Sequence, residues 1–131
     1  MLHKGSRVLV VDDDAHVRLF LQAVLTEIGY AVTEAENGMD ALEKLTRGEF
    51  DLLIVDLMMP GMDGEELLQR VQEEYPEVKT MVLTGDNDLG GVQEAGSFGA
   101  QSYIRKPIVD LEAFLREIEQ ILDAPREHRK E

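Results

Sequence analysis

Five polar residues follow apolar runs of the sequence, where a parallel sheet would gather functional groups at one edge. They are Asp12, Asp13, Asp56, Thr84 and Lys106. Three close carboxylates repel one another unless a cation joins them. Carboxylate oxygens without histidine or cysteine favour Mg²⁺, which keeps several waters and accepts phosphate as a further ligand. The hydroxyl and the ammonium are suited to bind phosphoryl oxygens, and Asp56 is the natural nucleophile because a carboxylate can form an acyl phosphate.

Five short apolar runs are typical of buried strands, and they lie at 7–11, 30–35, 51–55, 79–84 and 100–105. Apolar residues at helical spacing follow the first run, and Gly29 can end that helix. Its stripe consists of Val17, Phe20, Leu21, Val24, Leu25 and Ile28.

Further helices are predicted after the other runs. A turn at Asn37-Gly38 precedes the second helix, which ends at Gly48. Its apolar residues are Met39, Ala41, Leu42 and Leu45. A third helix is expected over 64–75 and a fourth near 88–98, where each of several glycines costs about 1 kcal/mol relative to alanine. The last apolar stripe runs from Leu111 to Leu122.

This alternation predicts an α/β fold. Continuously apolar strands suit a parallel sheet covered on both faces, and right-handed crossovers make it doubly wound. We expect a five-stranded, flavodoxin-like (βα)5 sheet in the order 2-1-3-4-5. Such folds place their sites at the carboxyl ends of the strands, where the five polar residues fall.

Composition excludes several classes of protein. The chain has 131 residues, the size of one domain, with no cysteine and no apolar run long enough to span a membrane. No signal peptide is recognisable, so a cytoplasmic location is expected. The net charge of −14 would repel nucleic acid phosphates, which argues against direct DNA binding. The three histidines are interpreted as solvated surface residues.

Each candidate residue taken alone has a simpler explanation. Asp12 and Asp13 could cap the first helix, and Asp56 could be a turn residue. Thr84 could bond to the backbone, Lys106 could be solvated, and Tyr103 could be a half-buried packing residue. Their conjunction at the ends of separate strands favours the functional interpretation.

Four segments, "VLVVDDD", "DLLIVDLMMPGMDG", "MVLTG" and "SYIRKP", together resemble the receiver domain of two-component response regulators. The resemblance covers about residues 7–122 and is highly specific as an ordered set. It implies that Asp56 accepts a phosphoryl group from the phosphohistidine of a sensor histidine kinase or a histidine phosphotransfer protein. It further implies Mg²⁺ as cofactor. The implied metal ligands are Asp12, Asp13, Asp56 and the backbone carbonyl of Met58.

The resemblance also implies how the signal leaves the site. Thr84 and Lys106 match the phosphate-binding hydroxyl and lysine of the family, Tyr103 matches its rotating aromatic switch, and a cis peptide is expected before Pro107. Phosphorylation would change the surface of the fourth helix, the fifth strand and the last helix. That surface would act on an effector, on an output domain or on a second copy of the chain. We expect a receiver at 1–122, a charged tail at 123–131 and no effector domain after it.

Three alternatives share parts of this pattern. A phosphatase of the haloacid dehalogenase kind would need a second acid two residues past the nucleophile, where the chain has Met58. A flavin-binding flavodoxin would not carry acids at 12–14, because they would repel phosphate. A receiver that is never phosphorylated would not need the intact set of site residues. The prediction is therefore a signalling domain that catalyses only its own phosphotransfer and dephosphorylation.

Overall fold

A computed structural model describes residues 5–57, 64–85 and 100–124 of the chain. The strands are β1 (Arg7–Val11), β2 (Ala31–Ala35), β3 (Leu52–Asp56), β4 (Lys79–Thr84) and β5 (Ser102–Arg105). The helices are α1 (Ala15–Ile28), α2 (Gly38–Arg47), α3 (Gly64–Glu74) and α5 (Leu111–Asp123). The helix predicted near 88–98 lies outside the described residues, as does most of the predicted tail.

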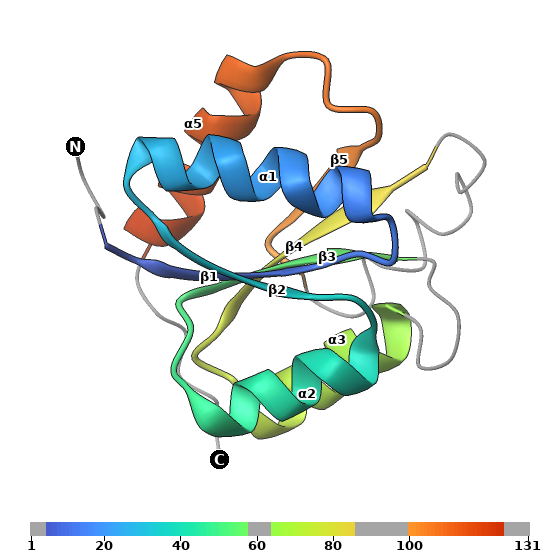
Figure 1. Cartoon of the computed structure of the whole chain (residues 1–131). Helices are drawn as coiled ribbons and strands as arrows, with labels where there is room; N and C mark the ends of the chain where they lie inside the picture. Colours follow the sequence, from blue (N-terminus) through green and yellow to red (C-terminus); the bar gives the residue numbers. More distant parts are fainter. Residues whose placement is uncertain (1–4, 58–63, 86–99, 125–131) are drawn as a thin grey trace.

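All five strands are parallel and form one sheet in the order β2-β1-β3-β4-β5, which confirms the predicted fold. Helices α1 and α5 cover one face of the sheet, and α2 and α3 cover the other (Figure 1). The order of the strands reverses between β1 and β3: β2 lies on one side of β1, and β3, β4 and β5 follow on the other side. In folds of this kind, the carboxyl ends of the strands beside that point form the binding crevice.

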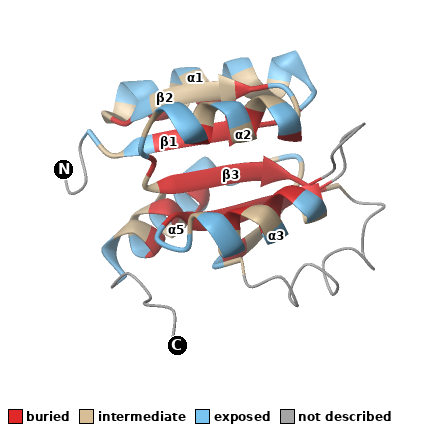
Figure 2. Cartoon of the chain, turned by 90° about the horizontal axis from the view of Figure 1, so that it is seen from below, coloured by how far each residue is buried: buried red, intermediate tan, exposed pale blue. Residues whose placement is uncertain are grey.

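The core consists of two layers, one on each face of the sheet. On β3, Leu53 and Val55 pack toward α2 and α3, whereas Leu52 and Ile54 pack toward α1 and α5. Every residue of β3 and β4 is buried, and Figure 2 shows the buried central strands between exposed helix surfaces. Fully burying one such side chain contributes roughly 1.5–3 kcal/mol. The strand that ends in Asp56 is therefore held firmly from both faces.

Local capping sets where the first two helices begin. The Asp14 side chain accepts a hydrogen bond from the amide of His16, and Asn37 accepts one from Asp40. Asn37 is thus a helix cap, and the turn predicted there is the start of α2. Gly29 ends α1 in the left-handed region, with φ of 120°, as its position predicts.

Three residues of the predicted apolar stripes lie at the surface instead, among them Leu111 at the start of α5, which is 36% exposed. Met39 is 64% exposed and Phe20 is 43% exposed. Met39 follows the buried Gly38, and Phe20 precedes the buried Leu21. One residue corresponds to a rotation of about 100° around the helix, which is enough to turn a side chain from the sheet to solvent. The stripes that contact the sheet are therefore narrower than the sequence pattern predicts.

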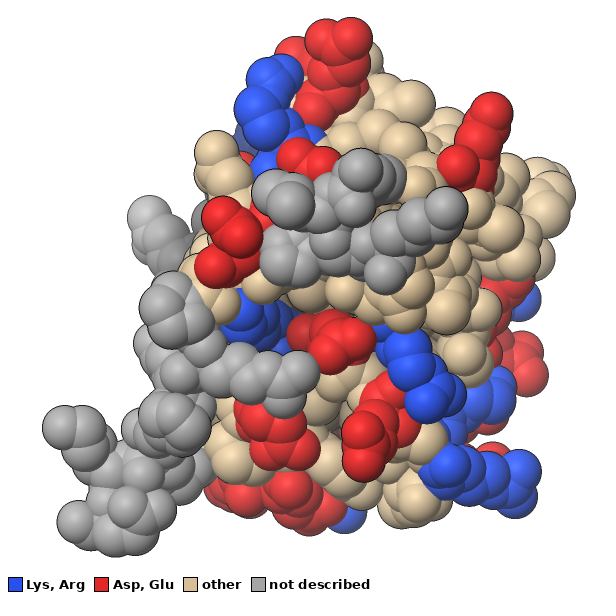
Figure 3. All heavy atoms as spheres, turned by 90° about the vertical axis from the view of Figure 1, so that its left-hand side faces the viewer, with Lys and Arg blue, Asp and Glu red and all other residues tan. Residues whose placement is uncertain are grey.

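Charges of both signs are interspersed on the face that carries the amino ends of the strands (Figure 3). His16 is solvent-exposed, as predicted, whereas His3 and His128 lie outside the described residues. None of the helices that the structure describes is long and apolar enough to cross a membrane.

Candidate metal and phosphoryl-binding site

Three carboxylates meet at the carboxyl edge of the sheet. Strands β1 and β3 are neighbours in parallel register, with Val11 opposite Val55, so the residues that follow them reach the same edge. Asp12, Asp13 and Asp56 each place a carboxylate oxygen within 4.8 Å of the other two. Asp12 is fully buried and Asp56 is 5% exposed, whereas Asp13 is solvent-exposed. Such a cluster of negative charge is costly without cations nearby.

Lys106 supplies one positive charge to this cluster. Its Nζ lies 3.2 Å from Asp12 Oδ2 and 3.5 Å from Asp56 Oδ2. Partial burial works against the charged ammonium, but the charges of Asp56 and Asp12 outweigh it, so the pKa of Lys106 is raised. Lys106 is therefore held as a cation between two carboxylates, not solvated as it would be on an open surface.

The donor set fits a hard divalent cation. Three carboxylates and one ammonium leave two negative charges, and every potential ligand is an oxygen. The three carboxylate oxygens lie within 4.8 Å of one another, which is close enough for one cation with metal–oxygen distances of about 2.1 Å to contact more than one of them. Met58, whose carbonyl is the fourth predicted ligand, lies outside the described residues.

The loop after β1 is held in place by its own hydrogen bonds. The amide of Asp14 donates to Asp12 Oδ1 at 2.9 Å, and the Asp14 side chain caps α1. Because Asp14 is the cap, the capping explanation no longer accounts for Asp12 and Asp13. Arg18 donates through Nη1 to the Asp12 carbonyl at 2.7 Å and through Nε to Glu34 at 3.2 Å.

Arg18 is a site residue that the sequence pattern did not reveal. It occurs inside the apolar stripe of α1, next to Val17, and nothing in the sequence pairs it with a strand end. Only the folded chain brings its guanidinium against the backbone that carries the first two acids.

Thr84 and Tyr103 share one face of the sheet. Thr84 is 1% exposed, and its Oγ1 has no hydrogen-bond partner within the described part of the chain. The backbone groups of the described residues therefore do not account for this hydroxyl. Tyr103 is opposite Val82 in the β4–β5 register, and Thr84 lies two residues after Val82 on the same face. Tyr103 is half-buried, and that burial raises the pKa of its hydroxyl.

Two backbone features position the site. The Lys106–Pro107 peptide is cis, as predicted, and the amide of Lys106 donates to the Thr84 carbonyl at 2.6 Å. Gly64 begins α3 directly against the end of β3. A Cβ at Gly64 would lie 2.7 Å from Leu57 Cα and would overlap the carbonyl oxygen of Asp56. The sequence predicts Gly64 as the first residue of a helix, but this close approach to the end of β3 is visible only in the structure.

Known proteins share both the sequence and the fold. The sequence profile of the response regulator receiver domain matches residues 8–119. The chain is 31% identical over 124 residues to sporulation initiation phosphotransferase F of Bacillus subtilis (strain 168), covering 95% of this chain and 94% of that relative. It is 36% identical over 111 residues to the transcriptional regulatory protein ResD of the same organism, covering 85% of this chain but only 46% of ResD.

A solved structure superposes closely. Response regulator protein TrrA from Thermotoga maritima, in complex with Mg²⁺-BeF, has a TM-score of 0.79 and 31% identity. The superposition covers 88% of this chain and 98% of that chain.

Proposed function

This chain belongs to the family of response regulator receiver domains, and from that membership we propose that Asp56 accepts a phosphoryl group in a Mg²⁺-dependent reaction. The observation that carries this proposal is the cluster of Asp12, Asp13 and Asp56 around the ammonium of Lys106. Asp56 lies at the end of a fully buried strand and still faces the charged edge of the sheet. The proposed donor is the phosphohistidine of a sensor histidine kinase or of a histidine phosphotransfer protein.

The proposed reaction is an in-line transfer. An Asp56 carboxylate oxygen forms a bond to phosphorus while the phosphorus–nitrogen bond of the donor breaks, and the electron pair of that bond returns to the histidine ring. A Mg²⁺ ion held by Asp12, Asp13 and Asp56 would neutralise charge on the phosphoryl oxygens. Lys106 can bind a second phosphoryl oxygen, and the hydroxyl of Thr84, which has no hydrogen-bond partner among the described residues, can donate to a third.

We further propose that the phosphoryl group acts through Thr84 and Tyr103. If Thr84 Oγ1 moves toward a phosphoryl oxygen, it leaves space on the face that it shares with Tyr103. Tyr103 is only half-buried, so its ring can turn further inward. This movement would alter the surface of β5, α5 and the segment before β5, and so the binding of a downstream partner. That partner is an effector protein, an output domain or a second copy of the chain.

We infer the kind of partner from the net charge of the chain and from its relatives. With a net charge of −14, the chain is expected to act through protein contacts and not by binding DNA itself. The chain spans about half the length of ResD, which is named as a transcriptional regulatory protein. We place the receiver in the cytoplasm and assign it no catalysis beyond its own phosphotransfer and dephosphorylation.

The phosphoacceptor assignment is tested by intact mass after incubation with acetyl phosphate and Mg²⁺. One phosphoryl adduct, stable in acid and labile in base, is expected on the parent chain, and Asp56→Asn should remove it. Asp51→Asn is the matched control, because Asp51 precedes the same strand at its other end and accepts a hydrogen bond from Arg7 that asparagine can also accept. Equal labelling of Asp56→Asn and the parent would refute the assignment, and undiminished labelling in EDTA would refute the metal requirement.

The switch is tested separately by amide chemical shifts with and without beryllofluoride and Mg²⁺. Shift changes are expected along β5 and α5 as well as at the site, and Tyr103→Ala should reduce the distant changes. Changes confined to residues that contact the site would leave Tyr103 as a packing residue only.

A further inference from the structure

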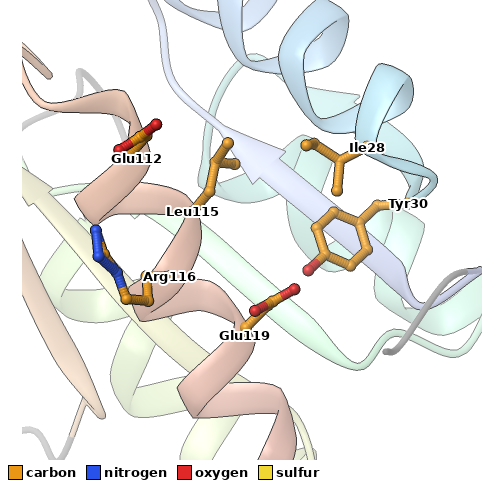
Figure 4. A pocket seen from close by; sticks show the side chains of 6 residues that line it. All are labelled: Ile28, Tyr30, Glu112, Leu115, Arg116 and Glu119. Carbon is orange, nitrogen blue, oxygen red and sulfur yellow. The ribbon is translucent and has the colours of Figure 1, made fainter. Parts of the chain in front are cut away.

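A groove lies between α1 and α5 (Figure 4). Its volume is about 310 Å³. It is lined by Ile28, Tyr30, Glu112, Leu115, Arg116 and Glu119. Tyr30 immediately precedes β2, so this groove reaches the amino end of the sheet, whereas the three acids lie at its carboxyl end. The proposed phosphotransfer uses none of the six lining residues.

The hydroxyl of Tyr30 is the unusual group in this groove. Tyr30 is 3% exposed, and its hydroxyl oxygen is buried with no hydrogen-bond partner among residues 5–57, 64–85 and 100–124. A buried polar group without a partner destabilises the folded chain. Figure 4 shows the hydroxyl directed toward the carboxylate of Glu119. Burial, and to a smaller extent the charge of Glu119, raise the pKa of Tyr30, so the phenol stays protonated.

The remaining lining residues define what the groove can hold. Ile28 and Leu115 face each other across it and offer apolar surface, beside the ring of Tyr30 (Figure 4). Arg116 extends along the outer side of α5, away from the Tyr30 hydroxyl (Figure 4). The inner end therefore presents one carboxylate and one phenol oxygen next to apolar walls. That combination suits a hydrogen-bond donor with a positive charge on an apolar stem.

We propose that this groove binds a primary ammonium or guanidinium group carried on an aliphatic stem. The charged head bonds to Glu119 and to the phenol oxygen of Tyr30, and the stem packs between Ile28 and Leu115. The overall charge of −14 attracts such a cation and opposes an anion. The cation comes either from a free alkylamine or from a lysine or arginine side chain of a partner protein, since both present the same chemistry.

The proposal is tested by titrating the ¹⁵N-labelled full chain with n-butylammonium at constant ionic strength. Saturable amide shifts are expected in residues 28–30 and 112–119. Uncharged 1-butanol, with the same stem, should bind at least tenfold more weakly, because a hydrogen bond between charged partners contributes about 1.5–3 kcal/mol and 1.4 kcal/mol is tenfold. Glu119→Gln should weaken n-butylammonium binding by a similar factor. Glu73→Gln, which makes the same change of charge at an exposed position of α3 on the opposite face of the sheet, is the control that should leave it within about twofold.

Tyr30→Phe separates a binding role from a packing role, because it removes only the hydroxyl. This variant should bind n-butylammonium several-fold more weakly while its melting temperature is unchanged or higher, since the buried hydroxyl that it removes has no hydrogen-bond partner among the described residues. A lower melting temperature with unchanged binding would overturn the proposal. Equal binding of 1-butanol and n-butylammonium would also overturn it, as would shifts spread evenly over the acidic surface.

A blocked tripeptide with a central lysine distinguishes the two sources of the cation. Tighter binding of the peptide than of n-butylammonium supports a partner protein's side chain as the occupant, and tighter binding of the amine supports a free alkylamine. Absence of saturable binding for both probes would overturn the proposal.

Discussion

Replacing Asp13 by asparagine should stabilise the metal-free protein and at the same time weaken its response to Mg²⁺. Asp13 is the exposed member of the acidic cluster, and its carboxylate oxygen lies within 4.8 Å of those of Asp12 and Asp56. Asparagine has nearly the same shape but carries no charge. The substitution therefore removes two repulsions without opening a cavity in the core.

The magnitude follows from these separations. At the upper limit of 4.8 Å, each repulsion is at least about 0.9 kcal/mol at the dielectric constant of water and at least about 3.5 kcal/mol at an effective value of 20. Because Asp13 is exposed, the lower value applies more closely, and the ammonium of Lys106 offsets part of it. We expect a gain of about 1–2 kcal/mol in the free energy of unfolding, which corresponds to a rise of roughly 3–8 °C in melting temperature for a domain of this size.

The assay is thermal unfolding with and without MgCl₂ at fixed ionic strength. The Debye length at 0.1 M salt is about 10 Å, so ordinary salt does not screen the cluster completely. Mg²⁺ at a hundredfold excess over its Kd should stabilise the parent by about 2.7 kcal/mol, and a tenfold loss of affinity would reduce this to about 1.4 kcal/mol. Asp13→Asn should therefore show a higher starting stability and a smaller magnesium effect.

Asp14→Asn is the matched control. It changes the net charge by the same amount one residue away, and asparagine caps a helix about as well as aspartate does. Its metal-free stability and its magnesium effect should stay close to those of the parent. An equal rise in melting temperature for both variants would show that overall charge, not the cluster, is responsible. A fall in the metal-free stability of Asp13→Asn would refute the electrostatic argument itself.

Three further substitutions follow from the site. Arg18→Met removes the hydrogen bond to the Asp12 carbonyl and should weaken Mg²⁺ binding about 10–100-fold, as measured by isothermal titration, while the fold persists. Lys106→Met should destabilise the metal-free protein at neutral pH. The pKa of Lys106 in the folded protein is raised above its ordinary 10.5, so its contribution to the free energy of unfolding is complete below that pH. This contribution is lost as the pH rises through the folded pKa. The unfolding curves of the parent and the variant should therefore converge in strong base. Gly64→Ala should lower stability by about 1–3 kcal/mol through overpacking against backbone. Gly48→Ala should cost less, because its Cβ would crowd only the flexible Arg7 side chain and would meet Phe50 at an ordinary contact distance. A milder effect for Gly64→Ala than for Gly48→Ala would contradict the described contact.

The sequence alone was enough to predict the fold. The apolar runs that become β3 and β4 are buried on both faces, and a strand of that kind is stable only inside a covered parallel sheet. Helical spacing and end residues such as Gly29 are equally local signals, so the described helices begin and end close to their predicted positions. The alternation of strands and helices is by itself enough to predict that Asp12 and Asp56 lie at the same edge of the sheet.

The tertiary structure alone decided how these residues meet. Lys106 is 94 residues from Asp12 in the chain, and their ion pair depends on the registers of β1, β3, β4 and β5 together. The buried hydroxyls of Thr84 and Tyr30 have no hydrogen-bond partner in the part of the chain that the structure describes, and this too depends on which residues pack around them. The spacing of apolar residues along the sequence predicts only which side of a helix or strand is buried. Which atoms lie within hydrogen-bonding distance is set by packing between segments far apart in the sequence, and no local pattern records it.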